Sequence, residues 1–258
     1  MNGVHPTAIV GESAKIGKGC QIGPYSTIGG EVVLGENVRV ESHAVIDGQT
    51  TIGDGSIVYP FVSIGLAPQD LKYVGEASST EIGKRNKIRE FVTIHRGTKG
   101  GGGVTKIGDD NLIMAQAHVA HDCIIGNGVI LANAATLAGH VEIGDKASIG
   151  AHSGVHQFCR IGFEAFVGGY SVVVKDAMPY ALIQGNHAKC YGLNRVGMKR
   201  RGYPKETIAN LNHAFHLLLS AKLNTTQAVE RIEAEIRDSK EVEMLVEFIK
   251  SSERGVVK

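Results

Sequence analysis

Two histidines and an aspartate stand close together near the middle of the chain. His118 and His121 are three residues apart, and Asp122 follows His121 directly. Near neutral pH an imidazole can take a proton from a substrate hydroxyl, and a neighbouring carboxylate can orient it and stabilise its charged form. These residue types and this spacing therefore suit general-base catalysis.

The stretch belongs to a six-residue repeat that runs from Val4 to Val173. An aliphatic residue recurs every six positions and is often followed by glycine, and a small residue comes four positions after it. A large inward side chain that alternates with a small one predicts short strands joined by tight bends. Three hexads per turn predict a triangular solenoid. The repeat is interrupted twice, and we expect external loops there, near residues 66–81 and 95–106.

Three hexads make a turn of 18 residues, so positions 18 apart should lie one strand spacing, about 4.8 Å, from each other. This places His121, Gly139 and Gln157 in one column and Asp122 under His140 in the next. A glycine N–H one rung from the imidazole can donate to an oxyanion, as acyl transfer requires. No serine or cysteine is aligned with these groups, which favours direct transfer over a covalent acyl-enzyme.

Helical periodicity replaces the hexads near the C-terminus. We expect a β-helix domain over residues 1–190 and a small α-helical domain over residues 191–258. Helices should begin near Pro204, Asn224 and Ser239, with apolar stripes that form the core of this domain. The stripes consist of Ile208, Leu211, Phe215, Leu218, Leu219, Val229, Ile232, Ile236, Val242, Leu245, Phe248 and Ile249.

The overall composition excludes several classes of protein. A formal net charge of +1 for 258 residues gives no general case for nucleic-acid binding. The four cysteines are scattered, without the paired spacing of a disulfide framework or a cysteine zinc site. No signal peptide and no apolar run of membrane-spanning length is present, so we expect a cytoplasmic protein without membrane insertion.

Several segments together resemble the family of UDP-N-acetylglucosamine 3-O-acyltransferases, which are hexapeptide-repeat transferases. The likeness covers nearly the whole chain and rests on residues 4–8, 69–73, 89–98, 117–123, 131–140, 155–159, 184–187 and 199–202. It implies a mainly β fold, a left-handed parallel β-helix followed by a small helical domain. It also implies transfer of a (3R)-hydroxyacyl group from acyl carrier protein to the 3-hydroxyl of UDP-N-acetylglucosamine, the first step of lipid A biosynthesis, without a cofactor.

The resemblance assigns roles to individual residues. His121 matches the general base, Asp122 the residue that orients it, and the Gly139 N–H the oxyanion donor. Gly169 falls where the family measures acyl length, and its missing side chain suggests a longer chain, with His187 near the far end. Sugar-nucleotide contacts would come from Asp70, Lys72, His118, His140, Gln157, Asn194 and Arg200.

The family is trimeric, with active sites between neighbouring subunits. The repeat agrees, because it places His121 at one corner of the triangle and Gly169, with Asn133 and Ala151, at another. His187 would join that second corner if the period continues so far. Acyl carrier proteins are acidic, so a basic docking surface is expected. Candidates are Lys84, Arg85, Lys87, Arg89, Lys199, Arg200 and Arg201.

Some alternatives remain open at this stage. Some hexapeptide-repeat proteins bind zinc between subunits through three histidines, and His118, His121 and His140 fit such a set. The chain could also be an acetyl-CoA-dependent acetyltransferase or a non-catalytic scaffold. Some relatives act on a 3-amino analogue of the sugar. Val196 stands where some relatives have a glutamate, which makes a side-chain contact to the nucleotide from this position doubtful.

Overall fold

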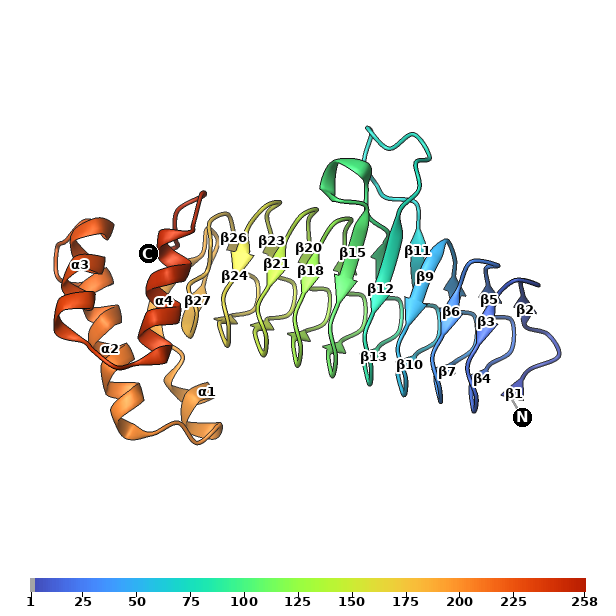
Figure 1. The fold of residues 1–258 in the computed structure, drawn as a ribbon, viewed down its shortest axis with the longest axis horizontal. Helices are drawn as coiled ribbons and strands as arrows, with labels where there is room; N and C mark the ends of the chain where they lie inside the picture. The colour runs from blue at the N-terminus through green and yellow to red at the C-terminus, as the bar shows by residue number, and fades with distance from the viewer. Residues whose placement is uncertain (1–2) are drawn as a thin grey trace.

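The structure is a computed structural model, and it describes residues 3–258. The chain winds into a long solenoid with a cluster of helices at its C-terminal end (Figure 1). Each turn contributes one strand to each of three sheets, so that a strand pairs in parallel with the third strand after it. The predicted triangular parallel solenoid is therefore confirmed.

The three sheets, named A, B and C, consist mostly of two-residue strands. Sheet A contains β1 (Gly3–Val4), β4 (Gln21–Ile22), β7 (Arg39–Val40), β10 (Ile57–Val58), β13 (Lys87–Ile88), β16 (Leu112–Ile113), β19 (Ile130–Leu131), β22 (Ser148–Ile149), β25 (Phe166–Val167), β27 (Ala181–Gln184) and β28 (Lys189–Leu193). Sheet B contains β2 (Ile9–Val10), β5 (Thr27–Ile28), β8 (Val45–Ile46), β11 (Ser63–Leu66), β14 (Thr93–His95), β17 (His118–Val119), β20 (Thr136–Leu137), β23 (Gly154–Val155) and β26 (Val172–Val173). Sheet C contains β3 (Lys15–Ile16), β6 (Val33–Leu34), β9 (Gln49–Ile52), β12 (Ser79–Ile82), β15 (Val104–Ile107), β18 (Ile124–Ile125), β21 (Glu142–Ile143) and β24 (Arg160–Ile161).

The aliphatic position of the hexad fills the interior of the solenoid. Ile113, Leu131 and Ile149 follow one another in register along sheet A, and each is at most 1% exposed. Burial of each such side chain stabilises the fold by roughly 1.5–3 kcal/mol relative to exposure. The column of small residues packs between them, and Cys123 and Cys159 are buried in it as free thiols.

The corners of the solenoid have a characteristic backbone conformation. One residue at most corners has a positive φ, and at the corner between sheets B and C these residues include Asp122, His140 and Phe158, at φ 61°, 61° and 62°. Because this left-handed conformation recurs every turn, corner side chains stack in ladders outside the solenoid. The His140 and Phe158 rings, for example, are stacked with centroids 4.4 Å apart.

Two excursions leave the solenoid at this same corner. The first occupies residues 67–78, between β11 and β12, and the second occupies residues 96–103, between β14 and β15. Both project from one edge of the molecule (Figure 1). The second includes a short 3₁₀ helix, η1 (Lys99–Gly101). Because the excursions insert extra residues, the interval between paired residues is longer than 18 here: Ser63 pairs with Thr93, and Thr93 pairs with His118.

The regular period ends at the last coil. Phe166 in β25 pairs with Leu182 in β27, which is 16 residues later, and β27 then pairs antiparallel with β28. The expectation that His187 continues the column of Gly169 is therefore wrong, since His187 lies in the turn between β27 and β28.

Four helices follow the sheets: α1 (Arg195–Arg200), α2 (Lys205–Leu219), α3 (Thr225–Glu235) and α4 (Lys240–Lys250). α1 was not expected from the sequence, because it has only six residues and includes a glycine. Most residues of the predicted stripes are buried, whereas Leu219, Ile236 and Phe248 are half-buried. α4 packs against the last coil, where the Arg160 guanidinium lies 4.4 Å from the Phe248 ring centroid. None of the described helices could cross a membrane, given their length and polarity.

Thr80 provides a test of the sheet packing. Its buried hydroxyl is without a hydrogen-bond partner among the described residues, whereas the Thr50 hydroxyl one coil away donates to the Asp47 carbonyl at 2.6 Å. Thr80→Val should therefore raise the free energy of unfolding by about 1 kcal/mol, because valine has nearly the same shape and no unpaired polar atom. Urea unfolding would measure the change. Thr50→Val is the control and should destabilise the fold; equal effects of the two substitutions would contradict the expectation.

Candidate active site

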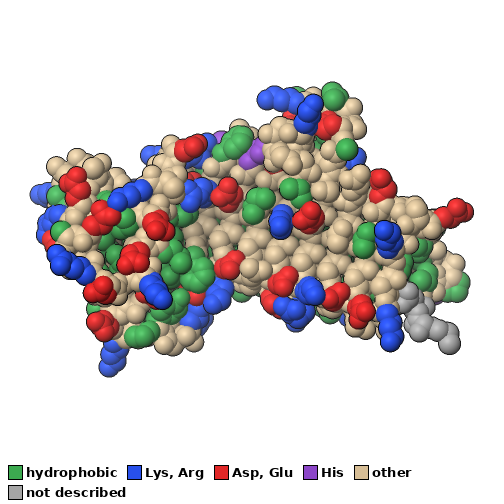
Figure 2. All heavy atoms as spheres, in the orientation of Figure 1, with side chains coloured by type: hydrophobic (Ala, Val, Ile, Leu, Met, Phe, Trp, Pro, Cys, Tyr) green, Lys and Arg blue, Asp and Glu red, His purple; other side chains and the backbone are tan. Residues whose placement is uncertain are grey.

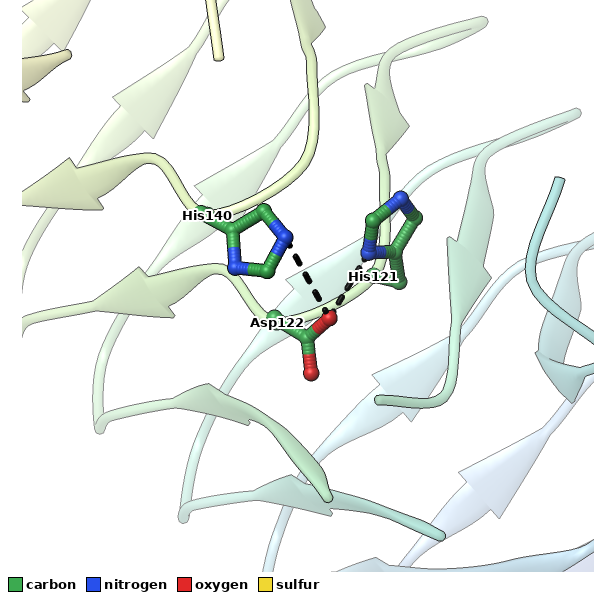
Figure 3. Close-up of side chains that lie close together, drawn as sticks. All are labelled: His121, Asp122 and His140. Carbon is green, nitrogen blue, oxygen red and sulfur yellow. Dashed lines mark hydrogen bonds and ion pairs between the residues drawn. The ribbon is translucent and has the colours of Figure 1, made fainter. Parts of the chain in front are cut away.

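His121 and Asp122 lie at the corner between sheets B and C, directly after β17. The His121 Nδ1 is 2.7 Å from the Asp122 Oδ2 (Figure 3). The Asp122 side chain is fully buried, whereas that of His121 remains 14% exposed. A carboxylate beside Nδ1 favours the tautomer that carries its proton there, which leaves the Nε2 lone pair free to accept a proton.

Gly139 lies one rung above His121, as the 18-residue period predicts. A Cβ on Gly139 would be 2.5 Å from His121 Cε1 and 2.8 Å from Nε2, so that a side chain at this position would displace the imidazole. Within residues 3–258, the Gly139 N–H donates no hydrogen bond. A free backbone donor thus lies beside the atom that would act as the base.

His140 occupies the same rung as Gly139 and lies close to Asp122. Its ring is perpendicular to that of His121, with centroids 5.1 Å apart, and its Nε2 is 3.8 Å from the Asp122 Oδ2 (Figure 3). Burial lowers the pKa of His140 below its ordinary value. His140 is therefore a neutral polar group at the edge of the site at pH 7.

Two further histidines lie on sheet B below the base. The His118 Nδ1 is 2.7 Å from the Thr93 hydroxyl, and the His95 ring lies perpendicular to that of His118 with centroids 5.1 Å apart. Burial lowers the pKa of His118 and brings the pKa of His95 to about 4. His95 was not expected at the site, since it begins the second interruption of the repeat, where register arithmetic does not apply.

The excursion at residues 67–78 brings Asp70 and Lys72 to this corner. Asp70 is near enough to His140 for its charge to influence the His140 pKa, although less than burial does. The Lys72 N–H donates to the Asp70 Oδ1 at 2.9 Å, which orients that carboxylate. Gln157 is exposed one rung beyond Gly139. Of the predicted sugar contacts, His118 and His140 thus lie beside the His121 imidazole of the same chain, and Asp70 and Gln157 lie further along the same corner.

An open groove of about 730 Å³ starts at Asp122 and His140 and passes Phe158. It continues along the outer face of sheet C to the C-terminal residues Ser251 and Arg254. Figure 2 shows histidine side chains at the edge of the molecule beside the projecting loops, and a face of mixed positive and negative charges below them.

Four predicted site residues lie elsewhere on the chain. Gly169 is exposed at the corner between sheets A and B, and His187 is exposed in the hairpin beyond it. Asn194 caps α1, where its side chain accepts from the Gly197 N–H at 3.0 Å. Arg200 is exposed near the end of α1 and has no ion pair within the part of the chain that the structure describes. A single chain does not bring these residues to His121.

The side chains of His121, Asp122 and His140 could also approach a metal ion, since one ligand atom from each lies within 4.8 Å of the others. This set differs from the three histidines considered above, because the His118 Nδ1 faces Thr93 instead. A metal ligated by the His121 Nδ1 would have to replace the proton between His121 and Asp122. The 2.7 Å contact between these residues is the geometry of a hydrogen bond, which favours the acid–base arrangement.

Comparison with known proteins decides the family. A model described as UDP N-acetylglucosamine O-acyltransferase, domain 2, matches residues 176–257, and a model of the bacterial transferase hexapeptide matches residues 13–48, 31–66 and 105–139. LpxA from Acinetobacter baumannii is 43% identical, with 99% of each chain covered and a TM-score of 0.97. The UDP-N-acetylglucosamine O-acyltransferase (LpxA) from Moraxella catarrhalis is also 43% identical, with the same coverage and a TM-score of 0.96. This chain belongs to the UDP-N-acetylglucosamine acyltransferase family.

The likeness to these acyltransferases extends over the solenoid and the helices alike. LpxA from Bacteroides fragilis, titled a UDP-N-acetylglucosamine acyltransferase, is 41% identical over 98% of this chain and 99% of its own, with a TM-score of 0.96. The resemblance found in the sequence is therefore confirmed, and so are the left-handed β-helix and the assignment as an acyltransferase enzyme. The roles of individual site residues stay predictions.

Proposed function

We propose that this acyltransferase moves a (3R)-hydroxyacyl group from acyl carrier protein to the 3-hydroxyl of UDP-N-acetylglucosamine. This is the first step of lipid A biosynthesis, in the cytoplasm. The observation that carries the proposal is the His121 imidazole, with Nδ1 on a buried carboxylate and with no hydrogen-bond partner for Nε2 among the described residues. The free N–H of Gly139 beside it supplies the second element that acyl transfer needs.

In the proposed reaction, the His121 Nε2 accepts the proton of the sugar 3-hydroxyl while the hydroxyl oxygen attacks the thioester carbonyl. Asp122 stabilises the resulting imidazolium, and the Gly139 N–H donates to the oxyanion. Collapse of the tetrahedral intermediate breaks the C–S bond and re-forms the carbonyl. The imidazolium then returns its proton to the departing thiolate, so that the products are the O-acyl sugar nucleotide and the free carrier thiol.

The nearest thiol does not suit a covalent route. Cys123 follows Asp122 in the chain, but it points into the solenoid, where its Sγ lies 3.2 Å from the Ala138 carbonyl oxygen. Burial raises the pKa of Cys123 to about 12, so that its nucleophilic thiolate is scarce at neutral pH. This supports direct transfer to the sugar hydroxyl.

A homotrimer would complete the site. His121 lies at the corner between sheets B and C, Gly169 at the corner between A and B, and Asn194 beside Glu164 at the corner between C and A. One cleft can receive all three only if neighbouring subunits supply them. Along the corner between sheets A and B, the exposed rings of Phe61 and Phe91 stack 5.0 Å apart, which provides an apolar edge suited to a subunit contact.

The predicted basic residues form two clusters, Lys84 to Arg89 and Lys199 to Arg201, which differ in how much of their positive charge is left unpaired. Lys84, Arg85 and Arg89 each form an ion pair, with Asp54, Asp110 and Glu90 respectively. Most of that cluster's positive charge is thus neutralised within the chain. In the cluster of Lys199, Arg200 and Arg201, Arg201 pairs with Glu164, whereas Lys199 and Arg200 are exposed and form no ion pair among the described residues. This cluster is the better candidate for docking an acidic carrier protein.

A panel of acyl donors tests the proposed function. With UDP-N-acetylglucosamine as acceptor, hydroxyacyl carrier proteins of several chain lengths should support turnover, and acetyl-CoA should not. Turnover with acetyl-CoA alone would identify an acetyltransferase instead, and no turnover with any donor would support a scaffold. The 3-amino analogue of the sugar, supplied in parallel, would show whether transfer goes to oxygen or to nitrogen.

Gly169 provides a test of the acyl pocket. Its position is exposed and has no positive φ, and a Cβ there would approach only the Ala151 backbone, at 3.2 Å from the carbonyl oxygen. Gly169→Met should shift the preferred donor to shorter chains by at least about tenfold in relative kcat/KM, because removal of space for a few methylenes costs about 1–3 kcal/mol. Competition between donors of two lengths measures this ratio. An unchanged ratio would place the acyl pocket elsewhere.

A further inference from the structure

One part of the site is not used by the proposed reaction. The excursion at residues 96–103 ends in the glycine run Gly100–Gly101–Gly102–Gly103, and it carries the buried residue Thr98. These residues lie outside the six-residue repeat, because the excursion is inserted between the solenoid strands β14 and β15. Two of them, Thr98 and Gly101, lie directly against Asp122.

Thr98 makes two short hydrogen bonds to the Asp122 carboxylate. Its N–H donates to Oδ1 at 2.7 Å, and its hydroxyl donates to Oδ2 at 2.6 Å. Oδ2 is the oxygen that also faces the His121 Nδ1 at 2.7 Å. Because Thr98 is only 5% exposed, water cannot readily replace its hydroxyl.

Gly101 covers the same carboxylate by close approach. A Cβ on Gly101 would overlap all three atoms of the Asp122 carboxyl group, whereas a Cβ on the neighbouring Gly100 would meet only the Thr98 hydroxyl, at 4.0 Å. The loop therefore packs directly on the carboxylate at Gly101 and leaves open space beside Gly100. This contact explains why glycine stands at position 101.

Hydrogen bonds connect this loop to β11 and to the excursion at residues 67–78. The Arg96 guanidinium donates to the Tyr73 hydroxyl at 2.8 Å and to the Gly65 carbonyl at 3.1 Å. The Lys99 N–H donates to the Glu76 carboxylate at 3.3 Å. The loop that carries Asp70 and Lys72 is thus connected to the loop that holds Asp122.

We propose that Thr98 is a positioning residue for the base: through the Asp122 carboxylate it fixes the direction of the His121 imidazole, and Gly101 leaves room for this arrangement. The inference rests on the proposed function. Without the hydroxyl, the carboxylate can rotate, and the imidazole loses the acceptor that directs its Nε2 to the substrate. A small misplacement of a catalytic group slows the chemical step far more than it weakens substrate binding.

Two pairs of variants in the full chain test this role. Thr98→Val removes the hydroxyl and keeps the shape, and Thr98→Ser keeps the hydroxyl. Gly101→Ala displaces the carboxylate, and Gly100→Ala adds the same methyl group into open space. Thr98→Val and Gly101→Ala should each lower kcat by about 10- to 100-fold, as is typical for the partners that orient a functional histidine, while the KM for UDP-N-acetylglucosamine changes by less than about threefold. Thr98→Ser should restore most of the turnover, and Gly100→Ala should leave it unchanged.

The opposite results would overturn the inference. Near-normal kcat in Thr98→Val, equal loss in Thr98→Ser, or a rise in KM that matches the fall in kcat would each show that Thr98 does not position the base. If Thr98→Val fails to fold, the two glycine variants decide, and equal kcat values for them would refute the proposal. His121→Ala belongs in the same assay: an active His121→Ala contradicts the proposed function itself, whereas an inactive one beside a normal Thr98→Val contradicts only the role of Thr98.

Discussion

Replacement of His121 by alanine is expected to lower kcat by about 10²- to 10⁴-fold, the range over which a positioned general base accelerates a reaction. The variant keeps the two Thr98 hydrogen bonds to Asp122, so that the buried carboxylate stays satisfied and the corner keeps its conformation. The effect should therefore appear in turnover and not in the unfolding midpoint. Steady-state rates at saturating acyl carrier protein and sugar nucleotide would measure it.

His5→Ala is a matched control for this experiment. His5 is an exposed histidine in the first coil, at the opposite end of the solenoid from the helices, and its ring hydrogen-bonds to Thr7. Its replacement should leave kcat unchanged. If His121→Ala retains turnover close to that of His5→Ala, His121 is not the base, and the neighbouring His140 becomes the group to examine.

Gly139→Ala is expected to have the second large effect, a loss of about 100-fold in kcat. The new methyl group would need the space of the His121 ring, since a Cβ there lies 2.5 Å from Cε1. A displacement of the imidazole by about 1 Å is enough to cost this factor. Because the change acts on the base and on the backbone around the oxyanion donor together, the loss should fall mainly on kcat.

Gly3→Ala serves as the control for an added methyl group. A Cβ on Gly3 would meet the Gln21 side chain at an ordinary 3.7 Å, far along the solenoid from the base. A crystal structure of Gly139→Ala should show the His121 ring turned away from Asp122. Full activity with an undisturbed His121 ring would mean that the corner adapts without loss and that close packing at Gly139 has no catalytic role.

The interior of the solenoid could be predicted almost completely. The hexad phase placed the aliphatic residues inward, and His118 pairs with Thr136 and Thr136 with Gly154 at the predicted 18-residue interval. The column of His121 and Gly139 follows from the same arithmetic. α3 was also readable, because Asn224 and Gln227 form a capping box at its start. In each case the pattern is local, and it repeats or ends at a recognisable residue.

The surroundings of the base depended on contacts between distant segments. Thr98 and His95 lie at the second interruption, where the phase is lost, so that their approach to Asp122 and His118 has no signature in the spacing. His187 lies outside its expected column because the last parallel strand pair, β25 with β27, has an interval of 16 residues instead of 18.

The sequence by itself determined the solenoid, its inward columns and the pairing of His121 with Gly139, because a period of 18 residues converts spacing directly into position. Only the tertiary structure decided how Asp122 is held. Besides the contact with His121, its carboxylate accepts two hydrogen bonds from Thr98, a residue 24 positions earlier on a loop that a second loop supports. A buried charge needs such partners, and any nearby loop with suitable donors could have provided them, so that the choice is made by packing and not by the repeat.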